Sequence, residues 1–211
     1  KCTTTSPNHR NTLSVICGPI TSELGRDIEN GQLTNYITQT ADPTSNRQLS
    51  KLLQSKYNWD LLEARNLWSL GPDSLLGPNV LIEDCIPSVT DKAAVASIKQ
   101  GLILGFQWAC REGPLCEEVV KNVKFRLIDA TISSEPAHKS GSQIIPACRR
   151  ACYAAMLSAS PRLLEPIAMV EIQTISECIS SIYSLLTKRR GHVVREVARG
   201  GTPFFFLHAL L

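Results

Sequence analysis

The sequence has 211 residues, of which 43% are hydrophobic and 19% are charged. These proportions are ordinary for a globular protein and argue against a chain that is disordered throughout. The formal net charge of +3 is too small to mark a nucleic-acid-binding protein by itself, although it permits contact with an acidic partner. No apolar run approaches the roughly 20 residues that a helix needs to cross a bilayer, so we expect no membrane contact.

Hydrophobic periodicity and turn residues predict the elements of the first three quarters of the chain. In chain order they are a strand at 13–17, helices at 21–29, 47–57 and 60–68, a buried strand at 79–84, a long helix at 91–110, a strand at 122–132 and a helix after residue 142. Polar loops are expected at 36–46 and 133–142. In the last helix we expect Pro146 in the first turn and an inward stripe of Ile145, Cys148, Cys152, Ala155 and Ala159.

Two glycines, Gly101 and Gly105, lie four residues apart inside the long helix. Each costs about 1 kcal/mol relative to alanine in a helix interior. We therefore expect another element to pack very closely against this face of the helix.

Prolines mark a domain boundary at 160–166. Beyond it the pattern predicts a strand at 167–173, a helix at 176–190, and strands at 192–197 and 203–210. Ser176 is expected to cap that helix and Gly191 to end it. This β-α-β-β order is three quarters of a split βαβ, ferredoxin-like unit.

Eight cysteines raise the question of a disulfide framework, which their spacing does not support. No Cys-x-x-Cys pair occurs, and the polar start from Lys1 to Ser6 does not match a secretory leader. We therefore predict free thiols in a reducing compartment, cytosolic or nuclear. The start without methionine and the apolar end from Phe204 to Leu211 indicate a fragment of a longer protein.

Motifs that would carry catalysis or hold a metal are not found in the sequence. It contains no Gly-rich phosphate loop, no His-Glu-x-x-His and no paired Cys/His spacing, so we expect no catalytic residue and no metal site. Cys148 and Cys152 are four residues apart on one helix face. We interpret them as core thiols, with redox chemistry or adventitious metal binding as the alternative.

One basic cluster is made of Lys188, Arg189, Arg190 and Arg195. These side chains have two interpretations: cations that complement the dipole at a helix C-terminus, or a contact with RNA phosphates or an acidic protein surface. Further positive charge lies at Lys121, Lys124, Arg126, Arg149 and Arg150. Those cations that alternate with apolar residues along a strand are interpreted as a solvated face, with a partner contact as the alternative.

Several ordered motifs resemble the elongation factor 2 family of translational GTPases over nearly the whole chain. They are Lys56-Tyr57-x-Trp59-Asp60, Gly71-Pro72-Asp73, Gly77-Pro78-Asn79, Gly105-Phe106-Gln107-Trp108, Gln143-Ile144-Ile145-Pro146, Pro161-Arg162-Leu163 and Lys188-Arg189-Arg190-Gly191-His192. The resemblance implies an α+β fold. Residues 1–163 would form the family's ribosomal-protein-like fourth domain, and 164–211 a truncated, ferredoxin-like fifth domain.

A spliceosomal branch of this family, the GTPase subunit of the U-five small nuclear ribonucleoprotein, resembles the chain more closely than the translational branch does. The shared motifs are Asp27-Ile28-Glu29-Asn30, Asp91-Lys92-Ala93, Arg111-Glu112-Gly113-Pro114-Leu115-Cys116, Asn122-Val123-Lys124-Phe125 and Glu135-Pro136-x-His138. Lys139, Ser140 and Ser142 replace the arginine and glycines usual in both branches. Because glycine permits backbone conformations that serine avoids, we expect a changed path for this loop and an unmodified His138.

The resemblance implies a role through contacts rather than catalysis. In the tip loop (residues 133–143), the implied contact residues are His138, Lys139, Ser140 and Gln143. The implied partners are a large spliceosomal scaffold protein, a helicase that unwinds small nuclear RNA, and U-five RNA through the parent protein. A nuclear location is implied, and GTP and magnesium would bind in a G domain absent from this chain. The alternative is the arm of a divergent translation elongation factor 2 that promotes ribosomal translocation.

Overall fold

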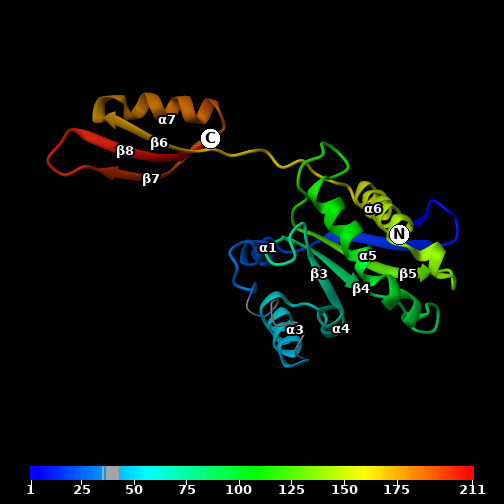
Figure 1. Cartoon of the computed structure of the whole chain (residues 1–211). Helices are drawn as coiled ribbons and strands as arrows, with labels where there is room; N and C mark the ends of the chain where they lie inside the picture. Colours follow the sequence, from blue (N-terminus) through cyan, green and yellow to red (C-terminus); the bar gives the residue numbers. More distant parts are fainter. Residues whose placement is uncertain (35, 37–42) are drawn as a thin grey trace. The chain divides into compact units, whose positions relative to one another are not determined.

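A computed structural model describes residues 1–34, 36 and 43–211, with the backbone alone for 43–46. The chain divides into two compact units, Lys1–Pro161 and Arg162–Leu211, which are described separately (Figure 1). Helices mix with strands in two sheets, which confirms the predicted α+β class. None of the helices in the described part is both long and hydrophobic enough to traverse a lipid bilayer.

The first unit is built on a five-stranded sheet in the order β1-β2-β5-β4-β3. Its strands are β1 (Cys2–Thr5), β2 (Thr12–Pro19), β3 (Leu67–Gly71), β4 (Asn79–Glu83) and β5 (Val123–Thr131). β4 and β5 run parallel, whereas the other neighbouring strands pair antiparallel. The long helix α5 (Lys92–Arg111) joins β4 to β5 and so provides the crossover that a parallel pair requires.

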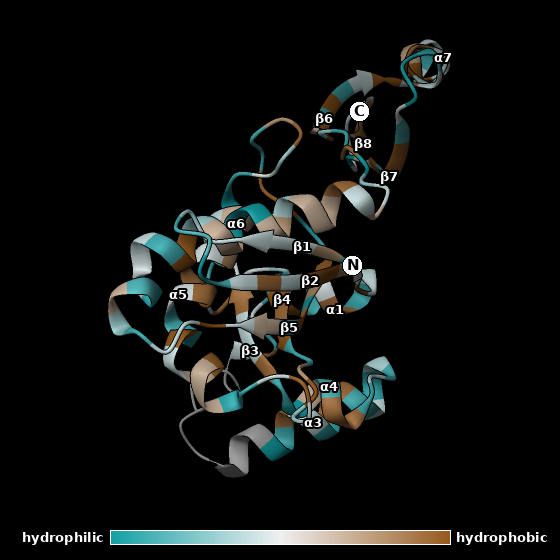
Figure 2. Cartoon of the chain, turned by 90° about the vertical axis from the view of Figure 1, so that its right-hand side faces the viewer, coloured by the Kyte–Doolittle hydropathy of each residue, from teal (hydrophilic) through white to brown (hydrophobic). Residues whose placement is uncertain are grey.

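Helices cover both faces of this sheet (Figure 1). One core lies between the sheet and α5 with α6 (Gly141–Ser158), and the other involves α1 (Ser22–Glu29), α3 (Pro43–Tyr57) and α4 (Leu61–Arg65). Figure 2 shows the resulting amphipathic pattern as bands of brown and teal along α3. In β4, Leu81 joins the first core, while Val80 and Ile82 join the second. A strand buried on both faces has to be apolar throughout, which explains this continuous run.

Helices α5 and α6 approach each other closely at the two glycines of α5. A Cβ atom placed on Gly105 would lie 2.7 Å from Cys148 Cβ and 2.8 Å from the Ile145 carbonyl oxygen. A Cβ atom on Gly101 would lie 3.2 Å from Ile144 Cγ2. The contacts advance in the same direction along both helices, so α5 and α6 run parallel. The expected close partner of the glycine face is therefore α6.

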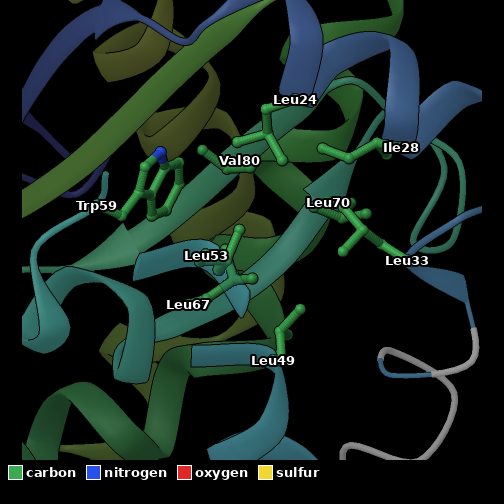
Figure 3. A pocket seen from close by; sticks show the side chains of 9 residues that line it. All are labelled: Leu24, Ile28, Leu33, Leu49, Leu53, Trp59, Leu67, Leu70 and Val80. Carbon is green, nitrogen blue, oxygen red and sulfur yellow. The ribbon is translucent and has the colours of Figure 1, made fainter. Parts of the chain in front are cut away.

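The core on the second face is dry and nearly filled (Figure 3). Side chains from α1, α3, β3 and β4 converge there on a cavity of about 10 Å³, which is large enough for one water molecule at most. It is lined by Leu24, Ile28, Leu33, Leu49, Leu53, Trp59, Leu67, Leu70 and Val80. The lining offers aliphatic groups and one indole, so this cavity is a packing gap and not a ligand pocket.

The second unit forms a three-stranded antiparallel sheet in the order β6-β8-β7. Its elements are β6 (Met169–Ile175), a 3-10 turn η2 (Ser176–Cys178), α7 (Ile179–Lys188), β7 (His192–Ala198) and β8 (Phe204–Leu210). Because β8 lies between β6 and β7, the β6-α7-β7 connection is split by a third strand. This is the topology expected for three quarters of a split βαβ unit.

Neither edge strand of the first sheet, β1 or β3, is predicted by the sequence pattern. The helix expected at 60–68 is wrong beyond residue 65. Asp60 caps α4 by accepting a hydrogen bond from the Leu62 amide at 3.0 Å, but the chain turns into β3 at Leu67. β3 is held by pairing with β4, as at Leu70 and Val80, so tertiary pairing overrides the local helical pattern.

Two helix starts and the inward stripe of one helix also differ from expectation. Helix α3 starts at Pro43, so the last part of the loop expected at 36–46 is its first turn, and 37–42 lie outside the described residues. Pro146 lies inside α6 rather than in its first turn, because this helix starts at Gly141. The inward stripe of α6 excludes the exposed Ala159 and the half-buried Ile145, and consists of Ile144, Ala147, Cys148, Ala151, Cys152 and Ala155.

Helix α7 begins and ends differently from the prediction. Ser176 lies in the turn η2, and α7 begins at Ile179 without a side-chain cap. At the other end Arg190, not glycine, adopts the left-handed conformation, with φ of 64°. The Gly191 amide then donates to the Leu186 carbonyl at 2.8 Å and closes the helix.

The close contact of α5 with α6 predicts the sign of a substitution at Gly105. In an open helix, Gly105→Ala would stabilise by about 1 kcal/mol, but overpacking against Cys148 costs about 1–3 kcal/mol. We expect a net loss of up to about 2 kcal/mol in the free energy of unfolding measured with urea. Gly18→Ala is the control, because no atom lies within 4 Å of its added Cβ. A stabilised Gly105→Ala variant would contradict the close contact.

Candidate interaction site

The tip loop connects β5 to α6 at one end of the first sheet. After β5 ends at Thr131, a 3-10 turn η1 (Pro136–Lys139) carries the chain to Gly141, where α6 begins. Proline fits the first position of such a turn because its missing N–H would have no partner there. Ser140 precedes α6 in an extended conformation, with φ of −62° and ψ of 158°. The loop therefore presents its residues directly before a helix N-terminus.

A buried asparagine, Asn11, fixes this loop from the turn between β1 and β2. Its Nδ2 donates to the His138 carbonyl at 2.7 Å, and its Oδ1 accepts from the Ser133 amide at 3.0 Å. The same Nδ2 donates to Ser6 Oγ at 3.1 Å. Asn11 and Ser6 are fully buried, so these hydrogen bonds are protected from water. The β1–β2 turn and the tip loop thus form one connected unit.

Asn8 adds a second connection between the turn and the loop. Its Nδ2 donates to the His138 carbonyl at 3.1 Å, and its backbone amide donates to Gln143 Oε1 at 3.0 Å. The carbonyl of His138 therefore accepts from two asparagines. Gln143 is engaged in holding the turn, which gives this predicted contact residue a structural role.

The outward groups of the tip loop are polar, and one of them, Lys139, is cationic. His138 is about one third exposed, and its Nδ1 lies 3.1 Å from Glu135 Oε2 and 3.4 Å from Ser133 Oγ. Lys139 is half-buried, and Ser140 is exposed and shares a hydrogen bond of 2.9 Å with Ser142. The structure therefore brings all four predicted tip residues into one loop, with groups suited to binding rather than to catalysis.

Sequence reasoning missed the β1–β2 turn as part of this site. The turn exposes His9 and Arg10 beside the tip loop, and His9 has a left-handed φ of 56°. The available signal was the polar stretch Ser6-Pro7-Asn8 before a hydrophobic strand, which is typical of a turn. That signal predicts a turn but not which distant loop it contacts.

The predicted basic cluster belongs to the second unit, whereas the tip loop belongs to the first. Lys188, Arg189 and Arg190 are exposed at the end of α7, and Arg190 forms an ion pair with Glu165. Arg195 is exposed on β7, opposite His208 of β8. The first three cations lie where the α7 dipole favours positive charge. Their contact with RNA or an acidic surface remains a prediction.

The further cations at 121–126 and 149–150 are paired within the first unit. Four of them form ion pairs: Lys121 with Glu29 (2.8 Å), Lys124 and Arg126 with Glu63 (2.8 and 3.1 Å), and Arg149 with Glu112 (2.7 Å). The fifth, Arg150, donates a hydrogen bond to the Thr5 carbonyl at 2.6 Å. Lys124 and Arg126 are only partly exposed. These side chains therefore do not form an open basic patch.

The two thiols of α6 in the first core are buried. Cys148 and Cys152 are buried, and Cys148 Sγ donates to the Leu102 carbonyl at 3.3 Å. A hydrogen bond with Cys148, together with burial, raises the pKa of the Cys152 thiol well above its ordinary value. Within the described residues no three His, Cys, Asp or Glu side chains are grouped as a metal ion would require. Both residues are therefore core thiols, as predicted.

The first unit is an α+β module that ends in a polar, hydrogen-bonded tip. A family model described as elongation factor G, domain IV, matches residues 39–160, which is more than half of the chain. The chain therefore belongs to the elongation factor G domain IV family. This confirms the resemblance of the fourth-domain motifs and the implied fold of this part.

Similarity to spliceosomal proteins extends over all 211 residues. The chain is 43% identical to the 110 kDa U5 small nuclear ribonucleoprotein component CLO and 42% identical to the 109 kDa component GFL, both of Arabidopsis thaliana. It is 40% identical to the pre-mRNA-splicing factor cwf10 of Schizosaccharomyces pombe. In each case all of this chain aligns with 21% of the relative, so it spans about a fifth of their length. The expected similarity to the spliceosomal branch is confirmed.

The asparagine connection predicts that Asn11→Ala loosens the tip loop. The substitution leaves the amide of the half-buried Ser133 without its acceptor. Loss of a partner costs about 1–3 kcal/mol for a fully buried group, which is the upper limit here. We expect lower stability in urea and faster hydrogen exchange at the Ser133 amide. The exposed Asn30 serves as a control, since Asn30→Ala should change neither quantity appreciably. Unchanged exchange at Ser133 in Asn11→Ala would contradict the role of Asn11.

The buried thiols predict a loss of stability at alkaline pH. Burial, with a smaller contribution from a nearby ionisable group, raises the pKa of Cys17 and of Cys85 from 9.0 to about 11. Below pH 9 both folded and unfolded thiols are protonated. Between pH 9 and 11 the unfolded thiols ionise while the folded ones do not, so stability falls as pH rises.

The urea midpoint should therefore decrease between about pH 8.5 and 10.5. The decrease should be smaller in a Cys17→Ala/Cys85→Ala variant. A Cys116→Ala/Cys178→Ala variant, which removes two exposed thiols, should keep the original pH dependence. Equal slopes in both double variants would show that Cys17 and Cys85 are not responsible.

Proposed function

We propose that this chain is the arm of a GTP-binding protein of the U5 small nuclear ribonucleoprotein and acts in pre-mRNA splicing. The observation that carries this proposal is similarity of 40–43% over the whole chain to two U5 components and a splicing factor. The similarity includes the tip loop and the second unit. A nuclear location follows from this role.

The arm acts by position rather than by chemistry. GTP and magnesium bind in a G domain outside this chain, and the nucleotide state there biases the orientation of the arm. The arm transmits this orientation to a large scaffold protein and to the helicase that unwinds small nuclear RNA during activation and disassembly. The hydrogen bonds of Asn8 and Asn11 support such a role, because a lever needs a tip with one fixed conformation.

The second unit corresponds to the family's fifth domain in this proposal. Its split β6-α7-β7 connection and strand order support the assignment. Residues 1–163 would then be the fourth domain, and 164–211 part of the fifth. Lys188, Arg189, Arg190 and Arg195 are its candidate contacts with RNA or an acidic protein.

The alternative is an arm of a translation factor that enters the ribosome. The family model alone fits this alternative, because it describes a domain of elongation factor G. The similarity of the whole chain to U5 and splicing proteins favours splicing. The two roles differ in the RNA that accompanies the protein.

Recovery of RNA with the tagged full-length parent protein tests the proposal. We expect strong enrichment of U5 small nuclear RNA, with ribosomal RNA at the level of an untagged extract. The enriched RNA should be accompanied by the scaffold protein. Ribosomal RNA as the enriched species would replace the proposal by the translational alternative.

Substitution of the tip separates its role from assembly of the particle. Lys139→Ala in the full-length protein should slow spliceosome activation in extract while U5 RNA is still recovered. The matched control is Lys51→Ala, an exposed lysine on α3. Equal activation rates in both variants would remove the tip loop from the proposed mechanism.

A further inference from the structure

A polar cleft lies at the end of the first sheet opposite to the tip loop. It has a volume of about 360 Å³ and is lined by Pro72, Asp73, Ser74, Gln107 and Arg111. Gly71 ends β3 beside the first residue of β4, and Arg111 ends α5 shortly before β5 begins. Because β4 and β5 are parallel, the cleft lies near their starts, whereas the tip loop follows the end of β5.

Two polar groups of the cleft are held in place by the fold. Asp73 Oδ1 accepts from the Leu75 amide at 2.7 Å, which orients the carboxylate and leaves its second oxygen for a ligand. Gln107 Nε2 donates to Ser69 Oγ and to the Leu70 carbonyl, each at 3.3 Å. These bonds occupy the amide nitrogen and leave Gln107 Oε1 as an oriented acceptor.

Arg111 supplies the unmatched charge of the cleft. Among the residues that the structure describes, its guanidinium has no hydrogen-bond or ion-pair partner, and it forms no ion pair with Asp73 across the cleft. A guanidinium binds a carboxylate through two parallel hydrogen bonds. Asp73 and Gln107 offer acceptors for N–H groups. The cleft therefore matches an occupant that carries a carboxylate beside several N–H donors.

A peptide has this combination of groups, and a nucleotide does not fit as well. Its backbone offers N–H groups to Asp73 and Gln107, and an acidic side chain offers a carboxylate to Arg111. A phosphate chain would meet one cation beside a fixed carboxylate, whereas phosphate-binding surfaces gather several cations. The volume lies within the range of about 300–1,000 Å³ that is common for small-ligand sites.

Apolar surface continues from the cleft along α5. Leu104 and Trp108, four residues apart, are 45% and 41% exposed and precede Gln107 and Arg111 by three residues each. The indole of Trp108 is fixed, since its Nε1 donates to Glu112 Oε2 at 3.2 Å and the Arg149 guanidinium lies 4.1 Å from its ring centre. Fixed, exposed aromatic groups are typical anchors of protein contacts.

We propose that this cleft binds an extended, acidic peptide segment of a partner protein, with its carboxylate on Arg111 and its backbone N–H groups on Asp73 and Gln107. The site is separate from the tip loop, so it does not depend on the proposed role in splicing. Partners bound here would be recognised by one acidic residue next to an apolar one.

Binding of blocked peptides to this chain, followed by amide chemical shifts, tests the proposal. The probe is acetyl-Leu-Ala-Asp-Ala-amide, its matched control has Asn in place of Asp, and guanosine monophosphate is the nucleotide probe. We expect saturable shifts at residues 72–75 and 104–112 in the millimolar range, at least tenfold weaker with the Asn peptide. Arg111→Gln should abolish them, whereas Arg65→Gln, an exposed cation on α4, should not.

Three results would overturn the proposal. One is the absence of localised shifts up to about 20 mM of the Asp peptide. Another is equal binding of the Asp and Asn peptides, or full binding by Arg111→Gln, which would remove the carboxylate contact. Stronger binding of guanosine monophosphate at the same residues would assign the cleft to a nucleotide instead. The amide spectrum of Arg111→Gln must otherwise match the parent, which controls for unfolding.

Discussion

The contact of α5 with α6 at Gly105 and Cys148 is the constraint on which the arrangement of the first unit depends. Because glycine has no side chain to separate the helices there, their axes come close, and this contact fixes how far one helix can slide along the other. The start of α6 carries the tip loop, and the end of α5 carries Gln107 and Arg111. One close contact thus places both surfaces at fixed positions on the sheet. Because the β4-α5-β5 crossover is parallel, the two surfaces lie at opposite ends of the sheet.

The elements predicted well from the sequence are those whose local pattern agrees with their surroundings. β4 is apolar throughout because both of its faces are buried, and α5 has one unbroken stripe against the sheet. The sequence pattern does not predict β1 and β3, for the opposite reason. An edge strand is stabilised by one neighbour, and β3 consists of residues that suit a helix equally well until β4 pairs with them. Periodicity within a segment cannot report a partner that is distant in the sequence.

The same limit applies to the candidate site. The four tip residues could be named from a resemblance, because the motif is continuous along the chain. Asn11 could not, because its importance lies in hydrogen bonds to residues more than 120 positions away. The partners of charged residues are equally hard to predict. The pattern of β5 predicts that Lys124 and Arg126 face solvent, but both form ion pairs with Glu63 of α4, which is distant in the sequence. Position along a strand predicts the face of a side chain but not its partner.

The serines of the tip loop lie where the backbone does not require glycine. Replacement of glycine by serine is costly where the backbone is left-handed, which is the reason why the sequence predicts a changed path; that remains a prediction. Ser140 has a φ of −62°, and Ser142 lies in the first turn of α6. Neither position has a left-handed backbone, so neither requires glycine. The two hydroxyl groups bind each other at 2.9 Å. Serine at these positions therefore alters the groups that the tip offers to a partner, while the carbonyl of His138 is still held by two asparagines. The recognition groups of the tip are thus carried on a backbone that hydrogen bonds to the β1–β2 turn hold in place.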